Sequence, residues 1–152
     1  MGDMHEIRAI PYLIKCGDNG IAMLLGRMGE DGLRALMPKL KETEGNIPAV
    51  YSVALSEMAR KGDVGYITDE KLRQEVRSYL LKALNNSDET GRKYAVRGLG
   101  EFAIQGDTEA TTLINNLAAA DPTVGKAKDY PIRTEAIRVL NKLKQKGAQH
   151  KP

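Results

Sequence analysis

Apolar residues recur along the chain at helical spacing. In segment 91–105, Ala95, Leu99 and Phe102 follow the i, i+4, i+7 spacing that places them on one face of a helix. The alternation of apolar and polar residues that is typical of strands is nearly absent. The sequence therefore predicts an all-α protein. Comparable apolar stripes lie in segments 48–60, 70–85, 108–119 and 133–146.

Gly-Asp pairs follow two of these stripes, at residues 62–63 and 106–107. Glycine tolerates the positive φ that often ends a helix, and aspartate accepts hydrogen bonds from the free N–H groups that begin one. We expect helices to end at these glycines, and we expect Asp107 to cap the next helix.

The chain also repeats itself. Residues 55–63 align with residues 99–107, and five of the nine positions are identical. Residues 92–99 align with residues 133–140, where two arginines, an alanine and a leucine recur. A weaker copy begins at Leu25. The two alignments have offsets of 44 and 41 residues, and repetition at such a period is typical of stacked helical hairpins.

We interpret the 152 residues as a single repeat domain, because each hairpin buries its apolar faces only against a neighbour. Segment 4–16 has the pattern of a second helix without its partner, so we expect it to cap the N-terminal end as a half-repeat. The four repeats are expected at residues 19–43, 46–85, 88–120 and 129–147.

Residues 88–121 carry an Asp-x-x-x-Arg-x-x-Ala-x-x-x-Leu-Gly pattern, followed by Gly-Asp and then by spaced leucines and an aspartate. Residues 129–140 repeat its first half. This pattern resembles the short HEAT repeats of phycobilisome-lyase-like proteins, most clearly over residues 88–143. Two positions depart from it: Gly91 stands where an apolar residue is usual, and Pro48 replaces the arginine of the second copy.

The resemblance implies a right-handed α-α superhelix, or solenoid, of about four helix hairpins. The first helix of each hairpin would lie outside and the second would line a concave groove that binds a protein, a peptide or a nucleic acid. Helix 70–85 would then be a groove helix. The side chains that we expect to bind a partner there are Arg34, Arg73, Arg77, Asn115 and Asn116.

Two acid-base pairs have the spacing of one helical turn. Asp88 precedes Arg92 by four residues, and Asp129 precedes Arg133 by the same interval. In the family that the chain resembles, such side chains link adjacent repeats. We expect these four residues to form structural ion pairs.

Arg97 and Arg138 occupy matching repeat positions on the opposite side of their helices from the apolar stripe. Both are expected to face water on the outer helices. An aligned pair of arginines also suits an anion, so these residues are the candidates for a phosphate or an acidic partner.

Composition narrows the range of functions. The chain has 23 Lys+Arg, 20 Asp+Glu, two histidines and one cysteine, and its net charge of +3 does not require a nucleic-acid partner. Two histidines leave a metal site almost without ligands, so we expect no metal, and no motif indicates a cofactor. Cys16 is expected to be a small buried side chain. One cysteine and the absence of a leader pattern or a long apolar run predict a cytoplasmic protein with no membrane partner.

The first hypothesis is therefore a non-catalytic interaction module or scaffold whose partner is another protein or a peptide. An alternative is a nucleic-acid-binding protein with the architecture of the HEAT-like DNA glycosylases but without evident catalytic residues. A weaker alternative is a bilin-lyase-like protein. No catalytic constellation is visible in the sequence, so we do not expect an enzyme.

Overall fold

The computed structural model describes residues 11–12, 15, 18–62, 66–85, 88–122, 124–125 and 129–149. Within these ranges the chain is helical and has no strand, so the all-α prediction is confirmed for them. Cys16 and most of the predicted cap at residues 4–16 lie outside the described residues. The helices are α2 (Asn19–Arg27), α3 (Gly29–Glu42), α4 (Ala49–Met58), α5 (Glu70–Ala83), α6 (Glu89–Ile104), α7 (Thr108–Ala120) and α8 (Pro131–Gln149).

Aspartate side chains begin four of these helices. Asp18, Asp69, Asp88 and Asp107 are the N-caps of α2, α5, α6 and α7, and each accepts a hydrogen bond from a backbone N–H of the first turn. Gly106 takes a φ of 103° between α6 and α7, which a side chain would disfavour. The predicted boundary at the second Gly-Asp pair is therefore confirmed.

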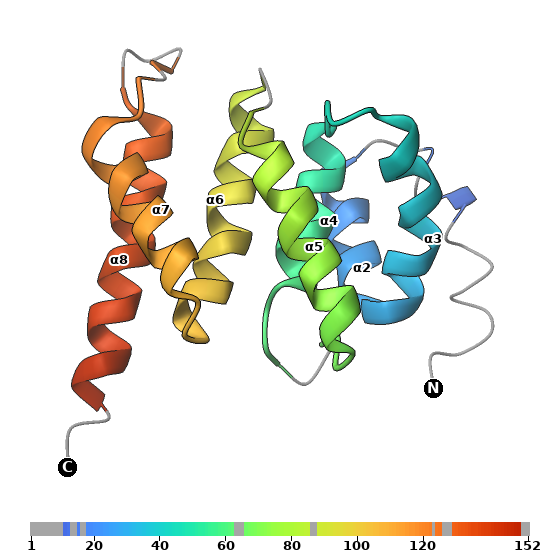
Figure 1. The fold of residues 1–152 in the computed structure, drawn as a ribbon. Coiled ribbons are helices and arrows are strands. Elements are labelled where there is room, and N and C mark those ends of the chain that lie inside the picture. The colour runs from blue at the N-terminus through green and yellow to red at the C-terminus, as the bar shows by residue number, and fades with distance from the viewer. Residues whose placement is uncertain are drawn as a thin grey trace.

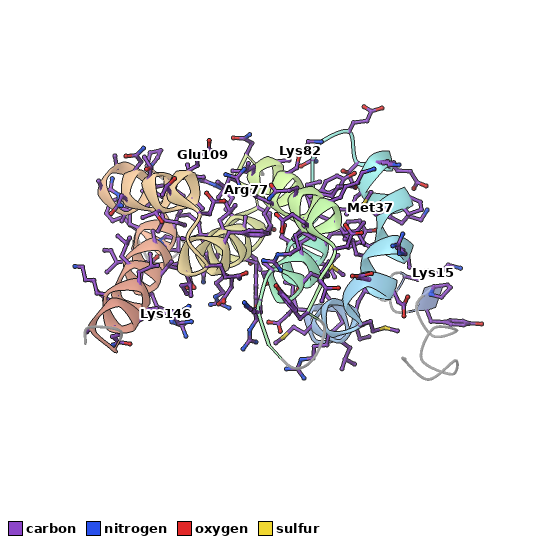
Figure 2. The ribbon with its side chains drawn as sticks, turned by 60° about the horizontal axis from the view of Figure 1, so that its bottom comes forward. Lys15, Met37, Arg77, Lys82, Glu109 and Lys146 are labelled. Atoms are coloured by element: carbon purple, nitrogen blue, oxygen red, sulfur yellow. The ribbon has the colours of Figure 1, made fainter. Side chains whose placement is uncertain are left out.

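The helices form two layers. Helices α2, α4, α6 and α8 pack side by side in that order, and we call them the even layer. Helices α3, α5 and α7 form the odd layer, and each packs across two neighbours of the even layer (Figure 1). In Figure 2, α5 and α7 lie above α4, α6 and α8. Helices α4, α6 and α8 thus touch one another in succession. They are the helices that the resemblance predicted to lie on the outside.

Small residues bring the even-layer backbones close together. A Cβ atom on Gly26 of α2 would lie 2.6 Å from the carbonyl oxygen of Ala54 in α4. One on Gly98 of α6 would lie 3.1 Å from the Cα atom of Ser56, also in α4. A Cβ atom on Gly100 would lie 2.7 Å from Val139 of α8. Each contact between even-layer helices therefore depends on a missing side chain.

One continuous apolar core fills the space between the layers. The residues that the helical pattern placed on one face of α6, Ala95, Leu99 and Phe102, are all buried there, as predicted. No helix in the described part of the chain combines the length and the apolar character needed to span a membrane.

We predict that Gly26→Ala destabilises the protein by about 2 kcal/mol, because the added methyl group would collide with the α4 backbone and force α2 outwards. Gly147→Ala is the matched control: it lies in α8, and nothing stands within 4 Å of the added Cβ atom. This control should gain about 0.5 to 1 kcal/mol from alanine's higher helix propensity. Urea unfolding followed by circular dichroism measures both, and equal stability of the two variants would contradict the packing.

Candidate functional site

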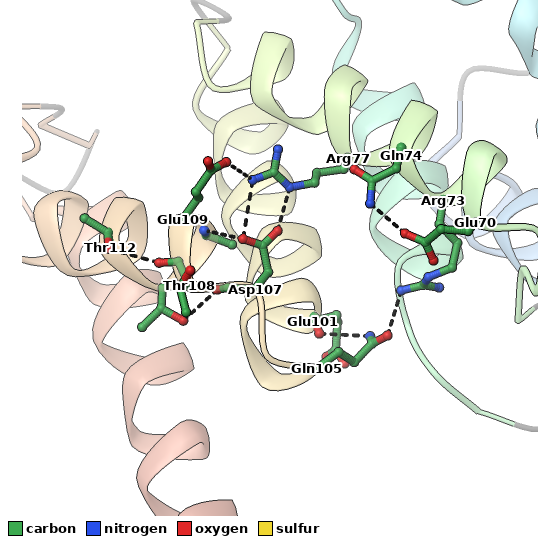
Figure 3. Close-up of polar contacts among 12 residues, drawn as sticks. Glu70, Arg73, Gln74, Arg77, Glu101, Gln105, Asp107, Thr108, Glu109 and Thr112 are labelled. Atoms are coloured by element: carbon green, nitrogen blue, oxygen red, sulfur yellow. Dashed lines mark hydrogen bonds and ion pairs between the residues drawn. The ribbon is translucent and has the colours of Figure 1, made fainter.

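Arg77 joins two helices of the odd layer. Its Nε atom lies 2.6 Å from Asp107 Oδ2, and its Nη2 atom lies 2.8 Å from Glu109 Oε2 at the start of α7 (Figure 3). Asp107 meanwhile accepts a hydrogen bond from the Ala110 N–H as the cap of α7. The Arg77 side chain is only 16% exposed, so the prediction that it is an open partner-binding residue is wrong. Its acceptors lie about thirty residues away in the next hairpin.

Arg73 is buried as well, at 5% exposure. Its guanidinium carbon lies 5.0 Å from the ring centres of both Tyr66 and Phe102, and its Nη2 atom donates to Gln105 Oε1 at 2.7 Å. Gln105 donates in turn to the carbonyl oxygen of Ala59, so the arginine is part of a cross-linked cluster. The expectation that Arg73 faces a groove is therefore wrong.

The other three predicted partner-binding residues are exposed but do not form one surface. Arg34 lies on α3, whereas Asn115 and Asn116 lie on α7, and α5 stands between these helices (Figure 1). Asn115 donates its side-chain N–H to the carbonyl oxygen of Thr111 within its own helix. The five residues therefore do not line a common site.

The predicted acid-base pairs have other partners. Asp88 caps α6, and Arg92 of the same helix forms an ion pair with Asp121 at the end of α7. Arg133 donates from Nε to the carbonyl oxygen of Asp121 at 2.6 Å. Among the residues that the structure describes, no ion pair joins Asp129 to Arg133. Both arginines thus link neighbouring helices through the buried Asp121.

In the even layer, Arg97 is held by an acid on the next helix. Its Nε and Nη2 atoms lie 2.7 and 3.3 Å from the two carboxylate oxygens of Glu135 in α8, and its guanidinium stacks on Tyr94. Glu135 is 8% exposed, and its hydrogen bond raises the pKa of Arg97 above the ordinary value. The Arg97 side chain is thus 38% exposed, as expected for a residue that faces water, but it is also ion-paired within the chain.

Arg138 lies beside this pair but is held less firmly. Its Nη1 atom is 3.7 Å from Glu135 Oε1, which is too long for a hydrogen bond, and its side chain is 60% exposed. A similar group lies on α2 and α4, where Glu57 lies 3.2 Å from Arg60 and 4.0 Å from Arg27. Each carboxylate therefore has two arginine neighbours.

These groups surround a hollow of about 260 Å³ between α4, α6 and α8, which we call the α4–α6–α8 hollow. Gly100 and Ile104 of α6 line it in the middle. The hollow lies on the even layer. Figure 2 shows that Lys146 of α8, in the same layer, lies at the opposite edge of the molecule from Arg77 and Glu109 of the odd layer. The charged lining of the hollow consists of Arg60, Arg97, Arg138, Lys142, Glu57 and Glu101.

Arg60 and Lys142 are the members of this set that the sequence did not single out. Both follow a charged residue by one helical turn, Glu57 and Arg138 respectively, which is ordinary on any exposed helix. Only the packing of α4 and α8 against α6 brings them to the same hollow.

The charged lining of the hollow suits binding by charge and hydrogen bonding. Within the described ranges, no group of three or more His, Cys, Asp or Glu side chains could hold a metal ion. The chain matches no protein-family model, no curated protein and no solved structure.

The ion pair between Arg77 and Asp107 makes stability depend on pH. The hydrogen bond from Arg77 lowers the pKa of Asp107 below its ordinary value of 3.8. A lowered folded-state pKa contributes stability above the ordinary value, and that contribution is lost as the pH falls through the lowered one.

We predict that Asp107→Asn, which keeps a capping side chain but loses the charge, costs about 1 kcal/mol at pH 7. The difference from the unaltered protein should shrink as the pH approaches 3, and urea unfolding at a series of pH values measures it. Glu109→Gln, at an exposed position, is the control and should change stability by only a few tenths of a kcal/mol. A difference that stays constant down to pH 3 would assign the loss to capping instead.

Proposed function

We propose that this chain is a non-catalytic protein-binding module, built as a HEAT-like α-solenoid whose concave surface is the even layer. The sequence resemblance supports the hairpin architecture, and the succession of contacts along α2, α4, α6 and α8 supports this choice of inner layer. In a curved stack the helices of the inner layer lie closer together than those of the outer layer. This assignment reverses the one expected from the resemblance.

The observation that carries the proposal is the α4–α6–α8 hollow. It lies on the proposed inner surface and presents the exposed cationic side chains of Arg138 and Lys142 from α8 and of Arg60, which follows the end of α4 by two residues. On the odd layer, by contrast, Arg73 and Arg77 are taken up by contacts within the chain. The proposed partner therefore lies across α4, α6 and α8.

A protein suits this surface better than a nucleic acid. Glu57 and Glu101 line the hollow together with the cations, and a phosphate backbone would have to pass both carboxylates. The lining also contains no aromatic side chain on which a base could stack. A polypeptide offers both acidic side chains and N–H donors, which match such a mixed surface.

Capture experiments with two charge-reversal variants test the proposal. Arg138→Glu with Lys142→Glu alters the hollow, whereas Arg34→Glu with Lys41→Glu makes the same change in charge on α3. We expect proteins retained by the immobilised chain from an extract of its source to be lost with the first double variant and kept with the second. Equal loss with both, or retention by both, would remove the even layer as the binding surface.

The nucleic-acid alternative keeps one observation in its favour, because Arg97 and Arg138 both line the hollow. We expect duplex and single-stranded DNA to bind no more tightly than about 100 µM at physiological salt, at the weak limit of non-specific binding. Fluorescence anisotropy at two salt concentrations measures this. Tight binding that falls steeply with salt, and that is lost with Arg138→Glu, would replace the protein partner with a nucleic acid.

A further inference from the structure

The cations in the hollow that have hydrogen-bond donors still unused indicate the chemistry of the partner. This inference rests on the proposed function. We infer that the α4–α6–α8 hollow binds a carboxylate side chain in an acidic segment of a protein partner. Arg138, Lys142 and Arg60 supply the hydrogen-bond donors, whereas Arg97 is a positioning residue.

The donors differ in how far they are already used. Arg97 donates two hydrogen bonds to Glu135, and its guanidinium plane lies over the ring of Tyr94, so it is fixed in place. Arg138 approaches Glu135 only at 3.7 Å. Lys142 is exposed and has no hydrogen bond or ion pair with any other described residue. Lys142 and most of the Arg138 fork are therefore open to a ligand.

Arg60 completes the set from the other side of the hollow. One of its guanidinium nitrogens lies 3.2 Å from Glu57, and the side chain is otherwise 58% exposed. It follows the end of α4 by two residues, whereas Arg138 and Lys142 come from α8. Gly100, which packs against Val139, and Ile104 line the hollow from α6.

Charge balance limits the ligand. Four cations line the hollow against the two carboxylates of Glu57 and Glu101, so two net positive charges remain. One or two carboxylates neutralise that excess, whereas a chain of phosphates brings more negative charge than the site can balance. Glu101 then serves as an acceptor for an N–H group of the partner's own backbone.

The size of the hollow also favours a single side chain as the ligand. Its volume of about 260 Å³ lies just below the roughly 300 to 1,000 Å³ of pockets for drug-sized ligands, so it holds a side chain with a few waters. The remainder of the partner segment would lie over the exposed side chains of α8.

The test uses two fluorescein-labelled peptides of twelve residues, one with glutamates spaced by glycine and serine and the other with glutamines in their place. We expect the glutamate peptide to bind at least tenfold more tightly at low salt, because the open donors pair with a charged acceptor. Arg138→Ala with Lys142→Ala should remove about tenfold of this affinity. The control, Arg34→Ala with Lys41→Ala on α3, should change it less than twofold.

A second variant separates a carboxylate site from general attraction between opposite charges. Glu101→Gln should strengthen DNA binding more than it strengthens binding of the glutamate peptide, because it removes a repulsion that acts on every phosphate. Equal affinity for the two peptides, or equal loss with the α8 and α3 variants, would overturn the inference. If charge reversal on α8 still abolishes capture of a protein partner while the peptides bind equally, the binding module stands and the carboxylate assignment falls.

Discussion

Close contact between backbones in the even layer is the constraint on which the rest of this structure depends. At Gly26 a Cβ atom would collide with the backbone of α4, at Gly98 with the Leu80 side chain of α5 while lying 3.1 Å from the α4 backbone, and at Gly100 with a side chain of α8. Helices that approach this closely leave no room for long side chains between them, so the long side chains near each contact are displaced to its edge. The arginines and glutamates of α4, α6 and α8 are such residues, and their displacement to one edge forms the hollow.

In the odd layer, by contrast, the helices do not pack directly against one another. Its helices are separated by the even-layer helices on which they rest, and long side chains bridge the gaps between hairpins. Arg77 reaches from α5 to the first turn of α7, and Arg73 reaches past Phe102 to Gln105. On the odd layer Arg73 and Arg77 are therefore bound within the chain, whereas Arg138 on the even layer has no hydrogen-bond partner among the described residues.

Local patterns in the sequence predict features that a single helix determines. The spacing of Ala95, Leu99 and Phe102 gives the buried face of α6, and the Gly-Asp pair gives the start of α7. The surroundings of Arg73 follow from no local pattern, because its partner Gln105 lies 32 residues away. The four-residue spacing of Asp129 and Arg133 permits an ion pair, but Arg133 turns instead to the end of α7. Which helices touch in succession is a property of the packing that hydrophobic periodicity does not specify.

The number of carboxylates beside the arginines separates Arg97 of α6, which is hydrogen-bonded within the chain, from Arg138 of α8, which is not. A carboxylate accepts two parallel hydrogen bonds from one guanidinium, and Glu135 accepts both from Arg97. Arg138, on the same helix as Glu135, is left within the attraction of that carboxylate but outside hydrogen-bonding distance. Its position is thus favoured electrostatically while its donors stay unused. In the proposed complex, a ligand carboxylate that enters the hollow would meet a cation whose hydrogen-bond donors are still available.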